Sequence, residues 1–187
     1  MNEKDILLRL EYVRQLFLKL ERLPQPVIAR VQGMATAAGC QLVAACDLAV
    51  ASEDARFALT EVSIGIMPGA GGTQNLPRAI GERRAKEVIL TARPFDAQQA
   101  LAWGVLNAVF PADEVISQAL QTAQRIAENA PLSVKQAKKS IRYGMQMELR
   151  TAFRFEVEAY NHLVDTEDRL EGVAAFNEKR KPHFKGR

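Results

Sequence analysis

The sequence predicts an α/β fold in which short buried strands alternate with helices, followed by a region of helices alone. Between Val27 and Phe110, brief apolar runs alternate with amphipathic segments and small-residue turns, which favours parallel strand pairing. After Pro111 the remaining segments all have helical spacing, and none reads as a strand. We therefore expect an α/β core over residues 1–111 and a helical region over residues 112–187.

Composition excludes several classes of protein. With 187 residues, of which 48% are hydrophobic and 25% charged, the chain can bury a substantial core. A formal charge of +3 is too small to argue for nucleic acid. No uncharged run reaches membrane-spanning length, and the N-terminus lacks a signal-peptide pattern. The sequence predicts a soluble, cytoplasmic protein, or a mitochondrial-matrix protein if the source is eukaryotic and the chain N-terminally truncated.

The individual elements are predicted from periodicity and punctuation. Apolar residues at three- and four-residue steps predict a helix over 4–22, which the segment Leu23-Pro24-Gln25-Pro26 ends. A strand from Val27 leads through small residues into a buried helix, and Asp96 is expected to cap a helix that Gly104 stops. Further strands are expected at 48–51, 57–59 and 105–110, and further helices at 73–80, 81–90, 97–103, 114–129, 132–143, 148–164 and 167–181.

The stretch from Val27 to Gly72 carries the features that suggest chemistry. A small-residue turn before a helix leaves first-turn N–H groups without intrahelical partners, and these stabilise an oxygen that develops negative charge. Glu61 lies in an otherwise apolar segment, where a carboxylate is either a satisfied structural acid or a general acid or base. The loop from Pro68 to Thr73 has almost no side-chain bulk, which suits close approach to its backbone.

Four motifs occur in a characteristic order: G-M-A-T-A-A-G-C-Q-L, F-A-L-T-E, G-I-M-P-G-A-G-G-T-Q and the C-terminal E-G-V-A-A-F-N-E-K-R-K-P-H-F-K. In this order the chain resembles the crotonase superfamily, the enoyl-CoA hydratase/isomerase enzymes. The resemblance implies a crotonase-like ββα spiral core, N-terminally truncated, with a helical C-terminal region that forms trimers or hexamers. It also implies an acyl-CoA substrate, which itself carries coenzyme A, so neither a cofactor nor a metal is expected. The usual N-terminal segment, whose G-A-D motif supplies one of the two oxyanion-hole donors, does not occur in this sequence.

The resemblance also assigns site residues. Glu61 matches the second of the two glutamates that hydrating members use, and Gln41 matches the first. Ala38 matches the glycine whose N–H is the second donor of the oxyanion hole. Gln41 either positions substrate or water, or is simply a polar residue left in a pocket that is no longer used. The implied substrate- and CoA-binding positions are Ala37, Gly39, Gly69, Gly71, Gly72, Tyr160 and Lys179, of which Tyr160 and Lys179 read equally well as a core-edge tyrosine and a solvated lysine.

Three functions follow from the resemblance. Likeness over the whole chain implies 2-enoyl-CoA hydratase, a lyase of fatty-acid or related acyl-CoA metabolism. An amide can hold a water but cannot take its proton, so Gln41 makes a Δ3,Δ2-enoyl-CoA isomerase with a single catalytic Glu61 the second candidate. A non-catalytic or truncated relative that only binds or oligomerises is the third.

Several other residues are expected to be structural. Cys40 and Cys46 lack any accompanying cluster of metal-ligating residues and are expected to be buried free thiols. Asp47 reads as a helix-end or turn residue. A helical stripe of basic residues reads as a solvated face rather than an RNA-binding surface, so we expect neither nucleic acid nor membrane as a partner. The stripe comprises Lys135, Lys138, Lys139 and Arg142.

Overall fold

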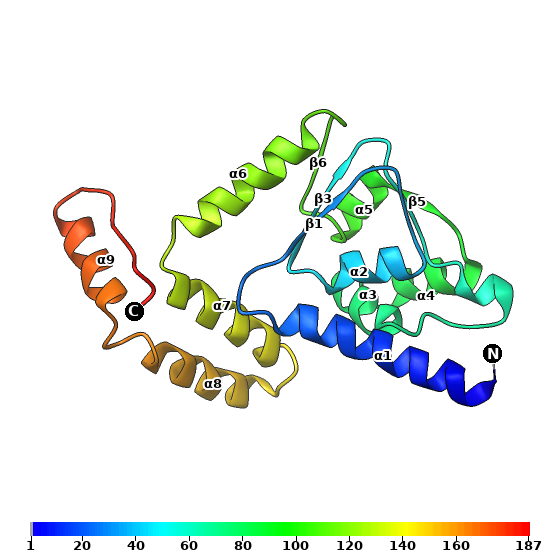
Figure 1. Cartoon of the computed structure of the whole chain (residues 1–187), viewed down its shortest axis with the longest axis horizontal. Coiled ribbons are helices and arrows are strands. Elements are labelled where there is room, and N and C mark those ends of the chain that lie inside the picture. Colours follow the sequence, from blue (N-terminus) through cyan, green and yellow to red (C-terminus); the bar gives the residue numbers. More distant parts are fainter. Residues whose placement is uncertain (1) are drawn as a thin grey trace. The chain divides into compact units, whose positions relative to one another are not determined.

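The computed structural model describes residues 2–187 and divides the chain into two compact units (Figure 1). The first unit comprises the described residues up to Leu23 together with Val27–Leu120. The second comprises Pro24–Pro26 and Gln121–Arg187. The boundary expected after residue 111 stays a prediction. Within residues 2–187 no helix is both long and apolar enough to cross a membrane.

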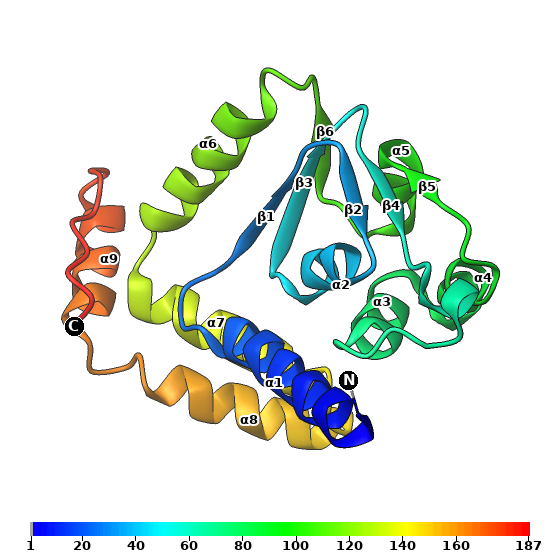
Figure 2. The same ribbon diagram turned by 45° about the vertical axis from the view of Figure 1, so that its right-hand side comes forward.

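Two three-stranded sheets form the framework of the first unit (Figure 2). The first has the order β1-β3-β6, with β1 (Ile28–Val31), β3 (Leu48–Ser52) and β6 (Ala108–Phe110) all parallel. The second has the order β2-β4-β5, with β2 (Met34–Thr36) parallel to β4 (Arg56–Ala58). The edge strand β5 (Phe95–Asp96) runs antiparallel to β4, which departs from the parallel pairing predicted for the core.

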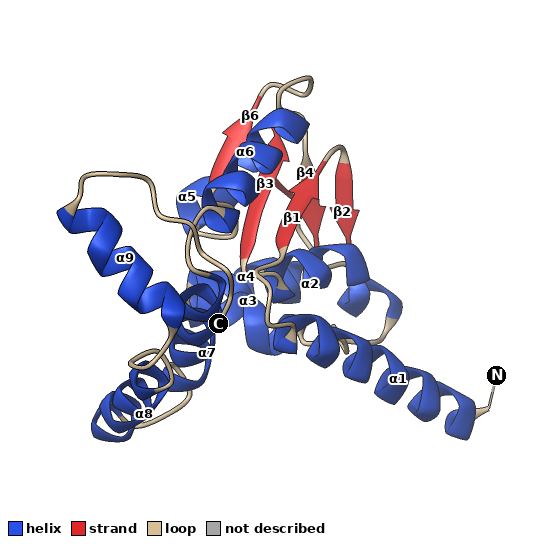
Figure 3. Cartoon of the chain, turned by 60° about the vertical axis from the view of Figure 1, so that its left-hand side comes forward, coloured by secondary structure: helices blue, strands red, loops and turns tan. Residues whose placement is uncertain are grey.

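Most helices of the first unit lie at one end of these strands, whereas one, labelled α5, lies beside them (Figure 3). The 20-residue α1 (Glu3–Arg22) begins with a capping box in which Asn2 and Asp5 exchange hydrogen bonds. α2 (Ala38–Ala45) directly follows β2 and lies between the diverging sheets in Figure 2. The remaining helices are the 3₁₀ helix η1 (Glu61–Ile64), α3 (Gly72–Ile80), α4 (Glu82–Thr91) and α5 (Ala97–Trp103).

Aromatic side chains fill the core of the first unit between the second sheet and its helices. Phe57 on β4 and Phe95 on β5 stack with their ring centroids 5.4 Å apart, and the Trp103 ring lies 5.2 Å from Phe95. Leu76 on α3 and Val88 on α4 are fully buried in the same core. This packing fixes α3 and α4 against the sheet, and with them the loop that precedes α3.

Three differences from the sequence-based prediction have local causes. The strand expected over 105–110 begins only at Ala108, because the N–H groups of Val105 and Leu106 both bond to the carbonyl oxygen of Ala100 and close α5. β2 and η1 were not predicted, because β2 has only three residues and η1 only four, too few to show a periodic pattern. The last helix ends at Asn177 rather than 181, because the chain reverses at Lys179, whose φ is +55°.

The second unit contains α7 (Pro131–Gly144), α8 (Leu149–Asn161) and α9 (Glu167–Asn177), while α6 (Val115–Ala127) crosses the boundary between the units. α7 and α8 pack together, with an edge-to-face contact between Tyr143 and Phe155 at 5.8 Å. The residues after α9 fold back along that helix. The buried carboxylate of Asp168 accepts hydrogen bonds from the N–H groups of Lys185 and Gly186, at 2.6 and 2.8 Å.

A second clamp on the same tail is sensitive to acid. The guanidinium of Arg180 donates to both carboxylate oxygens of Glu171, at 2.6 and 2.8 Å, and the His183 N–H donates at 2.8 Å. These bonds, the arginine's first, lower the pKa of Glu171 to about 2. Since the folded-state pKa lies below the ordinary value of 4.5, the clamp stabilises the tail fully above that value and loses its effect as the pH falls toward 2.

We therefore predict that acidification from about pH 5 to about pH 2 lowers the protection of the His183 amide against hydrogen exchange, relative to its intrinsic rate. Glu171→Gln should give low protection at both pH values. Glu156→Gln, which changes an exposed carboxyl on α8, is the matched control and should behave as the parent. Equal protection at both pH values in the parent would contradict this role of Glu171.

Candidate active site

One buried amide joins three segments of the first unit. Gln41 projects from α2 and is 3% exposed. Its Oε1 accepts hydrogen bonds from the N–H groups of Ala70 and Gly72, at 2.8 and 3.0 Å. Its Nε2 donates to Oε1 of Glu61 at 2.6 Å. The side chain of Gln41 therefore ties α2 to the loop before α3 and to the start of η1.

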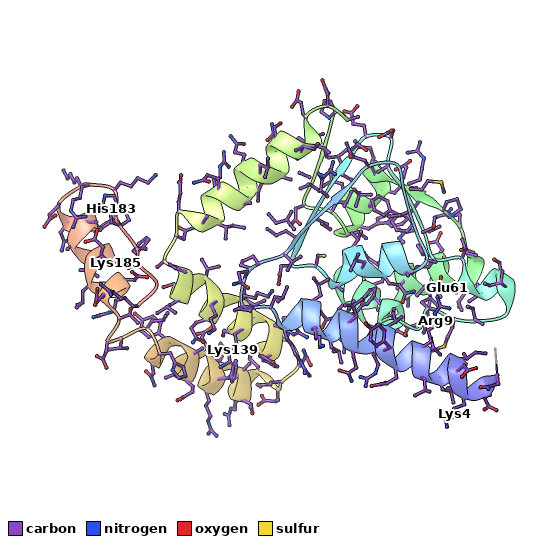
Figure 4. All side chains as sticks on the ribbon, in the orientation of Figure 1. Lys4, Arg9, Glu61, Lys139, His183 and Lys185 are labelled. Carbon is purple, nitrogen blue, oxygen red and sulfur yellow. The ribbon has the colours of Figure 1, made fainter. Side chains whose placement is uncertain are left out.

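Glu61 is the first residue of η1 and is 6% exposed, as its apolar sequence neighbourhood predicted. Figure 4 labels it among the side chains of the first unit. Its Oε1 is held by Gln41, whereas its Oε2 is buried and has no hydrogen-bond partner within residues 2–187. A buried carboxylate oxygen without a partner is costly in free energy, which is typical of a group that meets a substrate.

The start of α2 offers an N–H group to an oxygen. Ala37 has φ +49° and ψ −120°, and its N–H donates to the carbonyl oxygen of Ala58 at 2.9 Å. α2 then begins at Ala38, which is exposed. The N–H groups of a first helical turn have no intrahelical partners and carry the positive end of the helix dipole. Ala38 is thus placed to donate to a carbonyl oxygen, with Ala37 and Gly39 as its neighbours.

The three glycines of the loop are required for different reasons. Gly71 has φ +93° and caps α3 in a left-handed conformation. A Cβ atom added at Gly72 would lie 2.7 Å from Cγ of Gln41, and one at Gly69 would lie 3.0 Å from Cδ2 of Leu10 on α1. Gly72 thus makes room for Gln41; contact of the three glycines with substrate stays a prediction.

Neighbouring residues have structural roles. Burial, and secondarily the charge of Glu61, raise the pKa of the Cys40 thiol to about 12, so this thiol is protonated and unreactive at neutral pH. Cys46 is only half-buried, which corrects the prediction that both thiols are buried. Asp47 accepts a hydrogen bond from the N–H of Val27 at 2.7 Å and so secures the start of β1.

Two of the predicted substrate- and CoA-binding residues, Tyr160 and Lys179, lie in the second unit. Tyr160 is 61% exposed at the end of α8, and Lys179 is exposed just after α9. Both are on the second unit, and their contact with CoA stays a prediction.

Sequence reasoning missed Ala70 as a member of this site. Its side chain is a methyl group, and its contribution is the backbone N–H that binds Gln41. The run of small residues from Pro68 to Gly72 was a usable signal, since it predicted close approach to the backbone. The structure shows one such approach, by the side chain of Gln41, and approach of a substrate to this loop stays a prediction.

The backbone at Ala37 gives a first test of the site. Its φ of +49° with ψ −120° is disfavoured for any residue with a Cβ atom and costs roughly 1–3 kcal/mol. We predict that Ala37→Gly raises the free energy of unfolding by about 1 kcal/mol, after subtracting the entropy that glycine adds to the unfolded chain. Chemical denaturation measures this. Ala102→Gly in helix α5 is the control and should destabilise instead.

Gly72→Ala should have the opposite effect. The new Cβ would push against Cγ of Gln41 at 2.7 Å, and we expect a loss of about 1–3 kcal/mol in the free energy of unfolding from overpacking. Gly33→Ala would place its Cβ in open space but at φ +71°, so it controls for backbone strain away from Gln41 and η1. If displacement of Gln41 matters, only Gly72→Ala should perturb the NMR resonances of the Glu61 and Ala70 amides. Identical spectra for Gly72→Ala and the parent would contradict this packing.

Comparisons with known proteins identify relatives over the whole chain. Residues 2–187 match the sequence profile of the enoyl-CoA hydratase/isomerase family. The chain is 43% identical over 188 residues to the 2,3-dehydroadipyl-CoA hydratase of Escherichia coli, covering all of this chain and 74% of that protein. It is 44% identical over 167 residues to the short-chain-enoyl-CoA hydratase of Clostridium acetobutylicum, covering 89% of this chain and 64% of that protein.

Comparison with solved structures identifies the same family. The crystal structure of an enoyl-CoA hydratase from Bacillus anthracis superposes on the whole chain with a TM-score of 0.98 at 44% identity, and 72% of that chain is covered. The chain therefore spans from under two thirds to about three quarters of the length of these relatives. The predicted α/β fold is confirmed as the crotonase fold, and the chain belongs to the enoyl-CoA hydratase/isomerase family.

Proposed function

We propose that this chain acts on an acyl-CoA thioester through an enolate, with Glu61 as the group that moves the proton. The observation that carries the proposal is the state of the Glu61 carboxylate. One of its oxygens is held by Gln41 at 2.6 Å, and the other is buried without a partner. A general base needs such an arrangement, because one oxygen is fixed in place while the other is free to meet a proton.

The start of α2 supports the proposed stabilisation of the enolate oxygen. A thioester oxygen that accepts the Ala38 N–H becomes more negative as the α-carbon loses its proton, and the positive end of the helix stabilises that charge. The donor needs no reorganisation, since its position is set by α2. The resemblance to the family implies a second donor from a segment that this sequence does not contain.

Hydration of a 2-enoyl-CoA is the leading reaction. The similar proteins from E. coli and C. acetobutylicum are both named as hydratases of enoyl-CoA compounds. In such a step the oxygen of water bonds to the β-carbon while one of its protons passes to Glu61. A proton passes from Glu61 to the α-carbon, so water adds across the double bond. The Glu61 carboxyl group then has the same protonation state as before the reaction.

Gln41 favours the second candidate, Δ3,Δ2-enoyl-CoA isomerisation. Its amide cannot ionise, and its Nε2–H group already donates a hydrogen bond to Oε1 of Glu61. A 1,3-proton shift needs only one carboxylate, which removes a proton from one carbon and returns it to another. The third candidate is a binding or oligomerising relative without catalysis.

The wider proposal includes coenzyme A contacts and self-association. We propose that Tyr160 and Lys179 contact the CoA moiety and that the chain forms a trimer or hexamer through its C-terminal helices. Exposed apolar side chains on α8, such as Phe153 and Val157, support such an interface. A cytoplasmic location is proposed on the same resemblance.

The test follows the ultraviolet absorbance of a short 2-enoyl-CoA. We expect the parent chain to remove the conjugated absorbance and Glu61→Gln to do so about 10²–10⁴-fold more slowly, which is the usual contribution of a general acid or base. Glu53→Gln changes an exposed carboxyl and should match the parent. Equal rates for Glu61→Gln and the parent would contradict the role of Glu61. A parent that leaves 2-enoyl-CoA unchanged but forms it from 3-enoyl-CoA would establish isomerisation instead.

A further inference from the structure

We propose that Gln41 is a positioning residue whose locked amide leaves Oε2 of Glu61 as the one atom of this pair that takes and returns protons. The proposal rests on the proposed function and deepens it, because it assigns to Gln41 a role toward Glu61 rather than toward water or substrate. Three hydrogen bonds on one buried amide carry it.

The orientation of the amide is determined by its partners. The N–H groups of Ala70 and Gly72 are donors and can be met only by the amide oxygen. A flipped amide would point its NH₂ group at these two donors and its oxygen at the Glu61 carboxylate. All three hydrogen bonds would be lost, and like partial charges would face each other. Nε2 must therefore face Glu61.

Packing prevents Gln41 from turning away. The residue is 3% exposed, and the backbone of Gly72 lies so close that a Cβ atom there would reach 2.7 Å from Cγ and 3.0 Å from Cδ of Gln41. A side chain confined in this way has lost its rotamer freedom already in the folded chain. Binding of a substrate then needs no further ordering of Gln41 or of the carboxylate that it holds.

The consequence for proton transfer is specific. Gln41 neither accepts nor releases a proton, and its bond to Oε1 of Glu61 directs Oε2 away from the amide. Cys40, the neighbouring thiol, is protonated at neutral pH and is buried on the same helix. Proton transfer at the α-carbon therefore passes through Oε2.

The elementary step can be written without choosing between hydration and isomerisation. The α-hydrogen of an acyl thioester leaves as a proton to Oε2, and the C–H electron pair becomes the enolate, whose oxygen accepts the Ala38 N–H. The proton on Glu61 exchanges with solvent, and a solvent-derived proton returns to the α-carbon. In D₂O a saturated acyl-CoA should therefore gain deuterium at the α-carbon with no other change.

The experiment measures this exchange by mass spectrometry with butyryl-CoA in D₂O. Gln41→Met keeps the length of the side chain and removes the three hydrogen bonds. We expect its kcat for exchange to fall roughly 10- to 100-fold, as for a misaligned catalytic group, while its affinity for butyryl-CoA by calorimetry stays within about twofold of the parent. Gln98→Met on the exposed side of α5 is the matched control and should equal the parent. An unchanged kcat in folded Gln41→Met would overturn the proposal.

A second measurement needs no activity and no folded Gln41→Met protein. The side-chain NH₂ resonances of Gln41 in ¹⁵N-labelled parent should lie downfield and exchange slowly with solvent, because one N–H faces a buried carboxylate. Glu61→Gln should move them upfield. If the chemical shifts of the Gln41 NH₂ group are the same in Glu61→Gln and the parent, the contact between Gln41 and Glu61 is refuted, whatever the activity. A parent that exchanges no α-hydrogen contradicts the proposed function instead, and the NMR result then decides the contact alone.

Discussion

The hydrogen bonds of the Gln41 amide are the constraint on which the candidate site depends. They connect a helix that starts between two sheets, a loop with almost no side chains and a 3₁₀ turn. Each of these segments is short, and none would hold its conformation alone. A buried hydrogen bond of an amide stabilises the fold by only about 1 kcal/mol, but leaving one partner unsatisfied costs about 1–3 kcal/mol. Loss of the Gln41 amide would leave the partners of all three hydrogen bonds unsatisfied at once.

The hydrophobic core of the first unit stabilises the short segments that Gln41 connects. The stacked rings of Phe57 and Phe95, together with the fully buried Leu76, belong to one core that fixes the second sheet and α3. That core offsets two unfavourable features of the site, the left-handed backbone at Ala37 and the unpartnered Oε2 of Glu61. Both features lie at the proposed substrate site, and strained or unsatisfied groups that a stable core tolerates are common at functional sites.

Much of the fold was predictable from local patterns, and the site only in part. Periodicity predicted α1 and the helices of the second unit, and Asp96 was correctly expected to cap α5. β2 was missed because its three residues, Met34 to Thr36, are small or exposed and read as a turn. Likeness to a family pointed to Gln41 and Glu61, but not to their contact. They are 20 residues apart in the sequence, and only the fold brings Nε2 of Gln41 to 2.6 Å from Oε1 of Glu61.

Neutron diffraction of a deuterated crystal would determine the orientation of the Gln41 amide, because it locates the deuterons that distinguish its nitrogen from its oxygen. We predict two deuterons on the Gln41 atom that faces Glu61, one of them directed at Oε1, and none on the atom that faces the N–H groups of Ala70 and Gly72. Deuterons on the side facing the loop, or a Gln41 side chain turned away from Glu61, would contradict this prediction.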